Sequence, residues 1–231
     1  MSIEYKYIFR TIEYSAFVLY SLTLIFLIKN YRKEKIFIPF LLYILACYVV
    51  FNFRNPSPDT IQKIGSRNLK IMYEFINSFY TITEFFAFYL FLIIINKNDK
   101  LTKFINPIVI IFAILTFSYF SLLTSNTFKI SEISPPSIAL NIIEYSILLF
   151  LCLYSYYALA QKPINTKPIN IYNLWTLNSL FFYISISLPI IIIANKINPT
   201  SQLYTIMFMV HYTTIIILLA TLFFSVKNKS F

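Results

Sequence analysis

The sequence is poor in glycine and in charge. Its 231 residues include one glycine, Gly65, and only 12% are charged, whereas about a quarter of a soluble domain is charged. Transmembrane helices generally use more glycine than soluble ones, and a GxxxG helix contact is excluded because it needs two glycines. Close helix packing must therefore come from serine, alanine and threonine, with phenylalanine and tyrosine filling the larger gaps.

Motifs of several enzyme classes are also missing. There is no HExxH, no Walker loop and no GxSxG. The single histidine, His211, excludes a membrane hydrolase site built from several histidines. The two cysteines, Cys47 and Cys152, lie inside apolar runs and predict small buried side chains rather than a disulfide framework. No cofactor or metal site is predicted, although one histidine and two glutamates are groups that a divalent metal accepts.

Apolar residues dominate instead. They make up 58% of the chain. A helix that spans about 30 Å of hydrocarbon needs about 20 mostly apolar residues, and seven runs qualify. The sequence therefore predicts an all-α fold, a polytopic transmembrane bundle of seven helices that forms a single integral membrane domain over residues 1–231. The predicted helices cover about 9–29, 36–53, 69–96, 101–123, 137–160, 173–195 and 202–226.

The positive charge predicts membrane orientation. A net charge of +10 would point to nucleic acid in a soluble protein, but these cations lie in short loops between apolar runs, so no nucleic acid is expected. The odd-numbered loops and the C-terminus carry eleven: Lys29, Arg32, Lys33, Lys35, Lys97, Lys100, Lys103, Lys162, Lys167, Lys227 and Lys229. The N-terminus and the even-numbered loops carry eight: Lys6, Arg10, Arg54, Lys63, Arg67, Lys70, Lys129 and Lys196. This bias predicts an outside N-terminus and a cytoplasmic C-terminus.

Two glutamates interrupt the long third run. The segment YEFINSFYTITEFFAFYLFLIII, residues 73–95, holds Glu74 and Glu84. A charged carboxylate at the bilayer centre costs about 2.5–3.5 kcal/mol, and burial disfavours its charged form. At about 100° per residue, four polar residues fall within an arc of roughly 80°: Glu74, Asn77, Thr81 and Glu84. They form one polar stripe, which is predicted to face the bundle interior.

Three later helices also carry polar faces. The fifth has Ser137, Asn141, Glu144, Cys152 and Ser155 on one face. The sixth has Trp175, Asn178, Ser185 and Pro189, and the seventh has Tyr204, His211, Thr214 and Thr221. We expect the polar faces of the third, fifth and seventh helices to face one another. They would enclose an acidic pocket for a ligand or a proton, open to the outside or sealed in the bundle, made from Glu84, Glu144, His211, Asn77, Asn141, Asn178 and Glu74.

The same residues also have structural explanations. Interhelical hydrogen bonds, worth about 0.6–2 kcal/mol each, would account for the three asparagines as packing contacts. With the N-terminus outside, Glu74 and Glu13 would lie near the lipid headgroups. For the deeper Glu84 and Glu144, both a functional and a structural role stay open.

Four segments carry a resemblance to a known group of proteins. They are YEFINSFYTITEFFAFYLF, NIIEYSILLFLCLYSYYAL, NLWTLNSLFFYISISLPIII and MVHYTTIIILLATLFF. They resemble the third, fifth, sixth and seventh helices of small seven-helix inner-membrane proteins of Bacteroidota. The sixth helix of that group normally carries more glycine than this one. The resemblance implies seven helices and a bacterial inner membrane, and it implies no reaction.

The function expected from these observations is a non-enzymatic sensor or signalling protein of the membrane. A transporter, an oligomeric pore or a membrane effector of a stress or phage-defence pathway is the alternative. An intramembrane enzyme that uses Glu84, Glu144 and His211 is the third hypothesis. The expected partners are the lipid bilayer, a cytoplasmic protein docked on the basic inner loops, and further copies of the chain.

Overall fold

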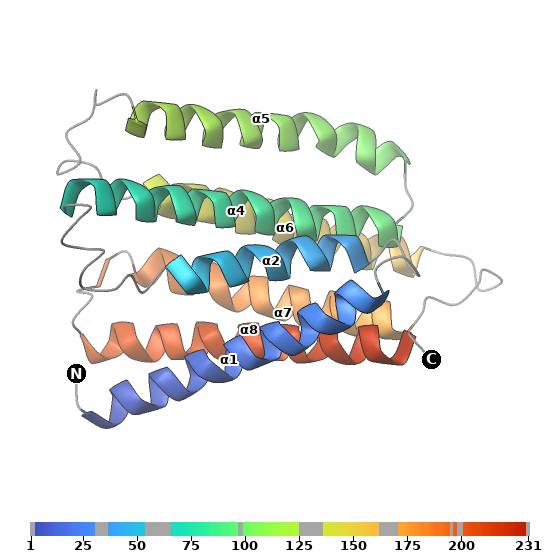
Figure 1. Cartoon of the computed structure of the whole chain (residues 1–231). Helices are drawn as coiled ribbons and strands as arrows, with labels where there is room; N and C mark the ends of the chain where they lie inside the picture. Colours follow the sequence, from blue (N-terminus) through green and yellow to red (C-terminus); the bar gives the residue numbers. More distant parts are fainter. Residues whose placement is uncertain are drawn as a thin grey trace.

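Over the residues that it describes, the computed structural model is an all-helical bundle of seven helices (Figure 1). It describes residues 3–30, 37–53, 66–96, 99–124, 136–161, 171–194, 196–197 and 201–229, and no strand occurs among them. The helices are α1 (Ile3–Asn30), α2 (Phe37–Phe53), α4 (Ser66–Asn96), α5 (Asp99–Thr124), α6 (Pro136–Ala160), α7 (Ile171–Ala194) and α8 (Gln202–Lys229). The predicted seven-helix fold is confirmed.

Helix ends follow local chemistry as well as the apolar runs. α6 begins at Pro136, in the first helical position, where the missing N–H of proline costs nothing. α8 begins after Ser201, whose hydroxyl accepts a hydrogen bond of 3.2 Å from the backbone N–H of Tyr204, as an N-cap serine does. α1 begins at Ile3, earlier than predicted, because the helical hydrogen bonding continues upstream of its apolar run.

Six of the helices form a closed ring. Each packs on two neighbours in the order α1, α2, α4, α6, α7, α8 and back to α1. α5 lies outside the ring against α4 and α6, at the top of Figure 1. Successive helices run in opposite directions, so the two ends of the chain lie at opposite ends of the bundle (Figure 1).

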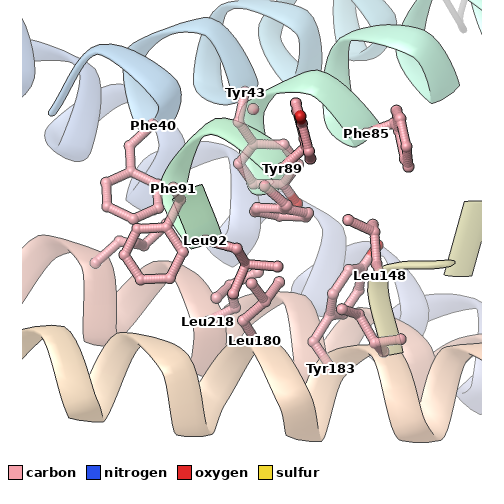
Figure 2. Close-up of a cluster of buried hydrophobic side chains, with 14 of the residues drawn as sticks. Phe40, Tyr43, Phe85, Tyr89, Phe91, Leu92, Leu148, Leu180, Tyr183 and Leu218 are labelled. Carbon is pink, nitrogen blue, oxygen red and sulfur yellow. The ribbon is translucent and has the colours of Figure 1, made fainter. Parts of the chain in front are cut away.

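The interior of the ring is aromatic and centred on α4. The core cluster joins side chains from all seven described helices, and Figure 2 shows part of it, including Phe40, Tyr43, Phe85, Phe91, Leu92, Leu148, Leu180, Tyr183 and Leu218. The Phe85 ring also packs against the tilted ring of Phe112 of α5, with ring centroids 4.5 Å apart, and this contact holds α5 against the six-helix ring. The large aromatic side chains fill the space that glycine-mediated contacts would otherwise close.

In the described part of the chain, four helices are long and apolar enough to cross a membrane. Among the described residues these spans are Phe75–Asn96, Ala139–Ala160, Ile171–Ala194 and Gln202–Ser225, and shorter apolar stretches are Tyr14–Lys29, Ile38–Val50 and Asn106–Tyr119. The outer faces are apolar too: Phe117 of α5, for example, is 73% exposed. An apolar exterior of this kind is unfavourable in water and suits lipid, so the structure supports a membrane protein.

Candidate functional site

Glu84 lies at the middle of α4 and is sealed inside the helix ring. Its side chain is 1% exposed. The hydroxyl of Tyr183, from α7, donates a hydrogen bond of 2.7 Å to its Oε1. The hydroxyl of Tyr145, from α6, lies 3.3 Å from its Oε2. One carboxyl group therefore joins three helices through both of its oxygens.

The two tyrosines also bond to each other. Their hydroxyl oxygens are 2.8 Å apart, and their rings meet edge to face at a centroid distance of 5.9 Å. A third phenol, Tyr80, lies one helical turn before Glu84 and is a further hydrogen-bonding neighbour of the carboxyl. We call Glu84, Tyr80, Tyr145 and Tyr183 the acid–phenol cluster.

Glu144 is a second buried carboxyl beside this cluster. It precedes Tyr145 on α6 and is also 1% exposed. Neither of its oxygens has a hydrogen-bond partner among the described residues. It is close enough to Glu84 for the two carboxyls to interact electrostatically. Leaving a buried polar group without a partner costs about 1–3 kcal/mol, and more when the group is charged.

A neighbouring hydrogen bond confirms that α4 and α6 face one another. The Thr81 hydroxyl donates to Asn141 Oδ1 over 2.7 Å. Because Thr81 precedes Glu84 by three residues and Asn141 precedes Glu144 by three, both pairs follow the same helix faces. Asn77, one turn earlier on α4, is exposed. The side chains of Glu74 and Glu13 lie outside the described residues.

The seventh helix in chain order, α8, does not meet α4 and α6 as expected. α8 packs on α7 and α1, and α7 completes the cluster in its place. His211 is half-buried and lies 2.9 Å, through Nδ1, from the Ser187 hydroxyl of α7. The His211 ring also contacts the Tyr183 ring at 5.7 Å, so Tyr183 contacts both Glu84 and His211.

The polar face predicted for α7 points away from the core. Trp175 and Asn178 are exposed, and Asn178 accepts a hydrogen bond of 2.6 Å from Tyr156 of α6. The buried face instead carries Thr176, Ser179, Tyr183 and Ser187. This correction has a physical reason: α7 carries polar residues on both its buried and its exposed face, so its sequence period does not distinguish the core face from the lipid face.

The tyrosines of the cluster are the site residues that the sequence did not indicate. The chain contains 19 tyrosines, so no single one stands out by composition. Two spacings were available as signals. Tyr80 precedes Glu84 by one helical turn, and Tyr145 directly follows Glu144.

Other kinds of site are weaker in the described part of the chain. No three His, Cys, Asp or Glu side chains come together there as metal ligands. A groove of about 530 Å³ runs along α1 and is lined by Thr11, Tyr14, Ser15, Val18, Leu19 and Leu22. None of these residues belongs to the acid–phenol cluster. Comparison with protein-family models, with curated proteins and with solved structures finds no match.

Proposed function

We propose that the protein is a non-enzymatic sensor or signalling protein of a bacterial inner membrane, and that the acid–phenol cluster is its responsive site. The observation that carries this proposal is the sharing of the Glu84 carboxyl among α4, α6 and α7. A change in the state of this one group alters hydrogen bonds on three helices at once. A group shared in this way allows a sensor to convert a small chemical event into a rearrangement of helices.

The burial of the cluster favours sensing over catalysis. A catalytic carboxyl has to touch a substrate, yet Glu84 and Glu144 are both sealed by the surrounding helices. The species that reaches such a position without an open cleft is a very small one. A small cation or a proton therefore suits the site better than an organic substrate.

Transport is the second candidate, and Glu144 is the observation that favours it. Ionisable residues inside membrane segments mark ion pathways and proton relays in transporters. A buried carboxyl without a described partner, beside a second carboxyl, resembles one step of such a pathway.

Reconstitution into lipid vesicles separates the two functions. A sensor moves no net charge, so vesicles carrying the protein should dissipate an imposed proton or potassium gradient no faster than protein-free vesicles. The matched variant is Glu84→Gln, which keeps the shape of the side chain and removes its titratable proton. A flux above the protein-free level that Glu84→Gln abolishes would replace the sensor proposal with a transporter.

The proposed orientation places the N-terminus outside and the C-terminus in the cytoplasm. It is supported by the excess of lysine and arginine in the odd-numbered loops and the C-terminus. A fluorescent protein that matures only in the cytoplasm, fused after Phe231, should fluoresce, whereas an alkaline phosphatase fused there should be inactive. The reverse result would show that the bundle has the opposite membrane orientation, with the basic connections outside.

A further inference from the structure

The proton is the ligand that fits the acid–phenol cluster most closely. We propose that Glu84 binds one proton in a closed ring of hydrogen bonds with Tyr145 and Tyr183, and that release of this proton breaks the link between α6 and α7. This inference deepens the proposed function and rests on it only for the consequence in signalling. The binding site itself rests on the geometry of three oxygen–oxygen contacts.

The hydrogen atoms in the ring can be counted. Three contacts join the carboxyl and the two phenols, at 2.7, 2.8 and 3.3 Å. Each contact needs one hydrogen, and the two phenols supply two between them. An ionised carboxylate only accepts hydrogen bonds, so one of the three contacts would bring two oxygen lone pairs together with no hydrogen between them. A protonated Glu84 supplies the third hydrogen, and every group in the ring then donates once and accepts once.

Loss of the proton forces the ring to rearrange. The proton passes to water and leaves a single negative charge on Glu84, and no covalent bond between heavy atoms changes. Tyr145 and Tyr183 then both donate to the carboxylate, because hydrogen bonds to a charged acceptor are the stronger ones. The bond between their hydroxyls loses its hydrogen, so a direct tie between α6 and α7 is lost.

Glu84, rather than Glu144, is the carboxyl that can exchange its proton. Glu84 has phenol donors that stabilise a negative charge, whereas Glu144 has no described donor. A charge on Glu144 would stay unpaired in a buried position, which is far more costly. We therefore expect Glu144 to stay neutral while Glu84 titrates.

The other titratable groups around Glu84 come from several helices. α1 contributes Tyr20, α2 contributes Tyr43 and Cys47, and α6 contributes Glu144 in addition to Tyr145. α8 contributes His211, whose imidazole contacts the phenol ring of Tyr183. α5 places Phe112 on Phe85 next to Glu84, and its polar contact with α4 is the hydrogen bond that Tyr89 donates to Asn106. No cation is among the described groups that act most strongly on Glu84.

Infrared spectroscopy of the purified protein in lipid nanodiscs tests the proposal directly. A protonated carboxyl has a C=O absorption that a carboxylate lacks. At mildly acidic pH the wild-type protein should show one such band that disappears in Glu84→Gln and another that disappears in Glu144→Gln. The Glu84 band should lie at lower frequency, because hydrogen bonding weakens its C=O bond while the Glu144 carboxyl has no described partner.

Two tyrosine variants give the test a readout that does not depend on removing the acid. Tyr183→Phe removes the 2.7 Å contact and should shift the Glu84 band to higher frequency without abolishing it. Tyr157→Phe alters an exposed tyrosine of α6 and should leave the band unchanged. If Glu84→Gln removes no protonated-carboxyl band at mildly acidic pH, the proposal is overturned. It is also overturned if the band appears only after sodium and potassium are withdrawn, since the site would then bind a metal cation.

Failure of this inference can be told apart from failure of the proposed function. A Glu84 band together with proton flux would keep the proton site and make the protein a transporter. An absent Glu84 band without any flux would remove the proton site and leave sensing by another ligand.

Discussion

The two buried glutamates differ in their partners, not in their burial. Glu84 has phenol neighbours and links three helices, whereas Glu144 has no described hydrogen-bond partner. Glu144 and Tyr145 are adjacent, so their side chains point about 100° apart around α6, and only Tyr145 reaches the ring. The difference shows that burial alone does not let a carboxyl link several helices. The link depends on the hydrogen-bond donors around the carboxyl.

The largest expected effect comes from removing the central phenol. Tyr183→Ala should lower the free energy of unfolding by about 3–5 kcal/mol, because it opens a cavity in the core and removes both hydrogen bonds of Tyr183. Reversible unfolding in mixed micelles measures this. Tyr157→Ala, at a position 61% exposed, is the matched control and should cost far less. Equal costs at the two positions would mean that the cluster does not hold the helices together.

Replacing each glutamate by leucine should change the free energy of unfolding in opposite directions at the two positions. Glu144→Leu should raise the free energy of unfolding by about 1–3 kcal/mol, because it removes a buried polar group that lacks a described partner. Glu84→Leu should lower it by about 1–2 kcal/mol, because it breaks the hydrogen bonds that join α4 to α6 and α7. The same unfolding assay serves both variants. A loss of stability in Glu144→Leu would indicate that Glu144 has a partner after all.

A double-mutant cycle on the two phenols should give a smaller effect. Tyr183→Phe and Tyr145→Phe should each cost about 0.5–1.5 kcal/mol, with Tyr183→Phe the larger because its contact with Glu84 is shorter. The double variant should cost less than the sum, because the hydrogen bond between the two hydroxyls is lost in either single variant. Simple additivity would show that the two phenols act independently and that no ring exists.

Much of the fold followed from the sequence because helix-forming runs are a local property. The end of α2 at Phe53, the end of α4 at Asn96 and the start of α8 at Gln202 all match the predicted limits. Two residues of the predicted polar stripe, Thr81 and Glu84, do face inward, whereas Asn77 of the same stripe is exposed.

The order of the helices around the bundle did not follow from the sequence. Periodicity gives the inner face of each helix but not which helix lies beside it. His211 was therefore expected next to Glu84, although α8 packs on α7 and Tyr183 lies at the junction. Tyr145 and Tyr183 were missed for a related reason: their role appears only when α4, α6 and α7 are placed together.

The pH response of α7 tests the central claim that Glu84 is the responsive group. The single tryptophan, Trp175, lies on α7 two turns before Tyr183, so its fluorescence reports on that helix. In nanodiscs, raising the pH from mildly acidic to mildly alkaline should change the emission of the wild-type protein and of Glu74→Gln, as the link between α6 and α7 breaks. Glu84→Gln should fold normally and lose this change, because its amide keeps the ring closed without a titratable proton. An unaltered pH response in Glu84→Gln would contradict the account.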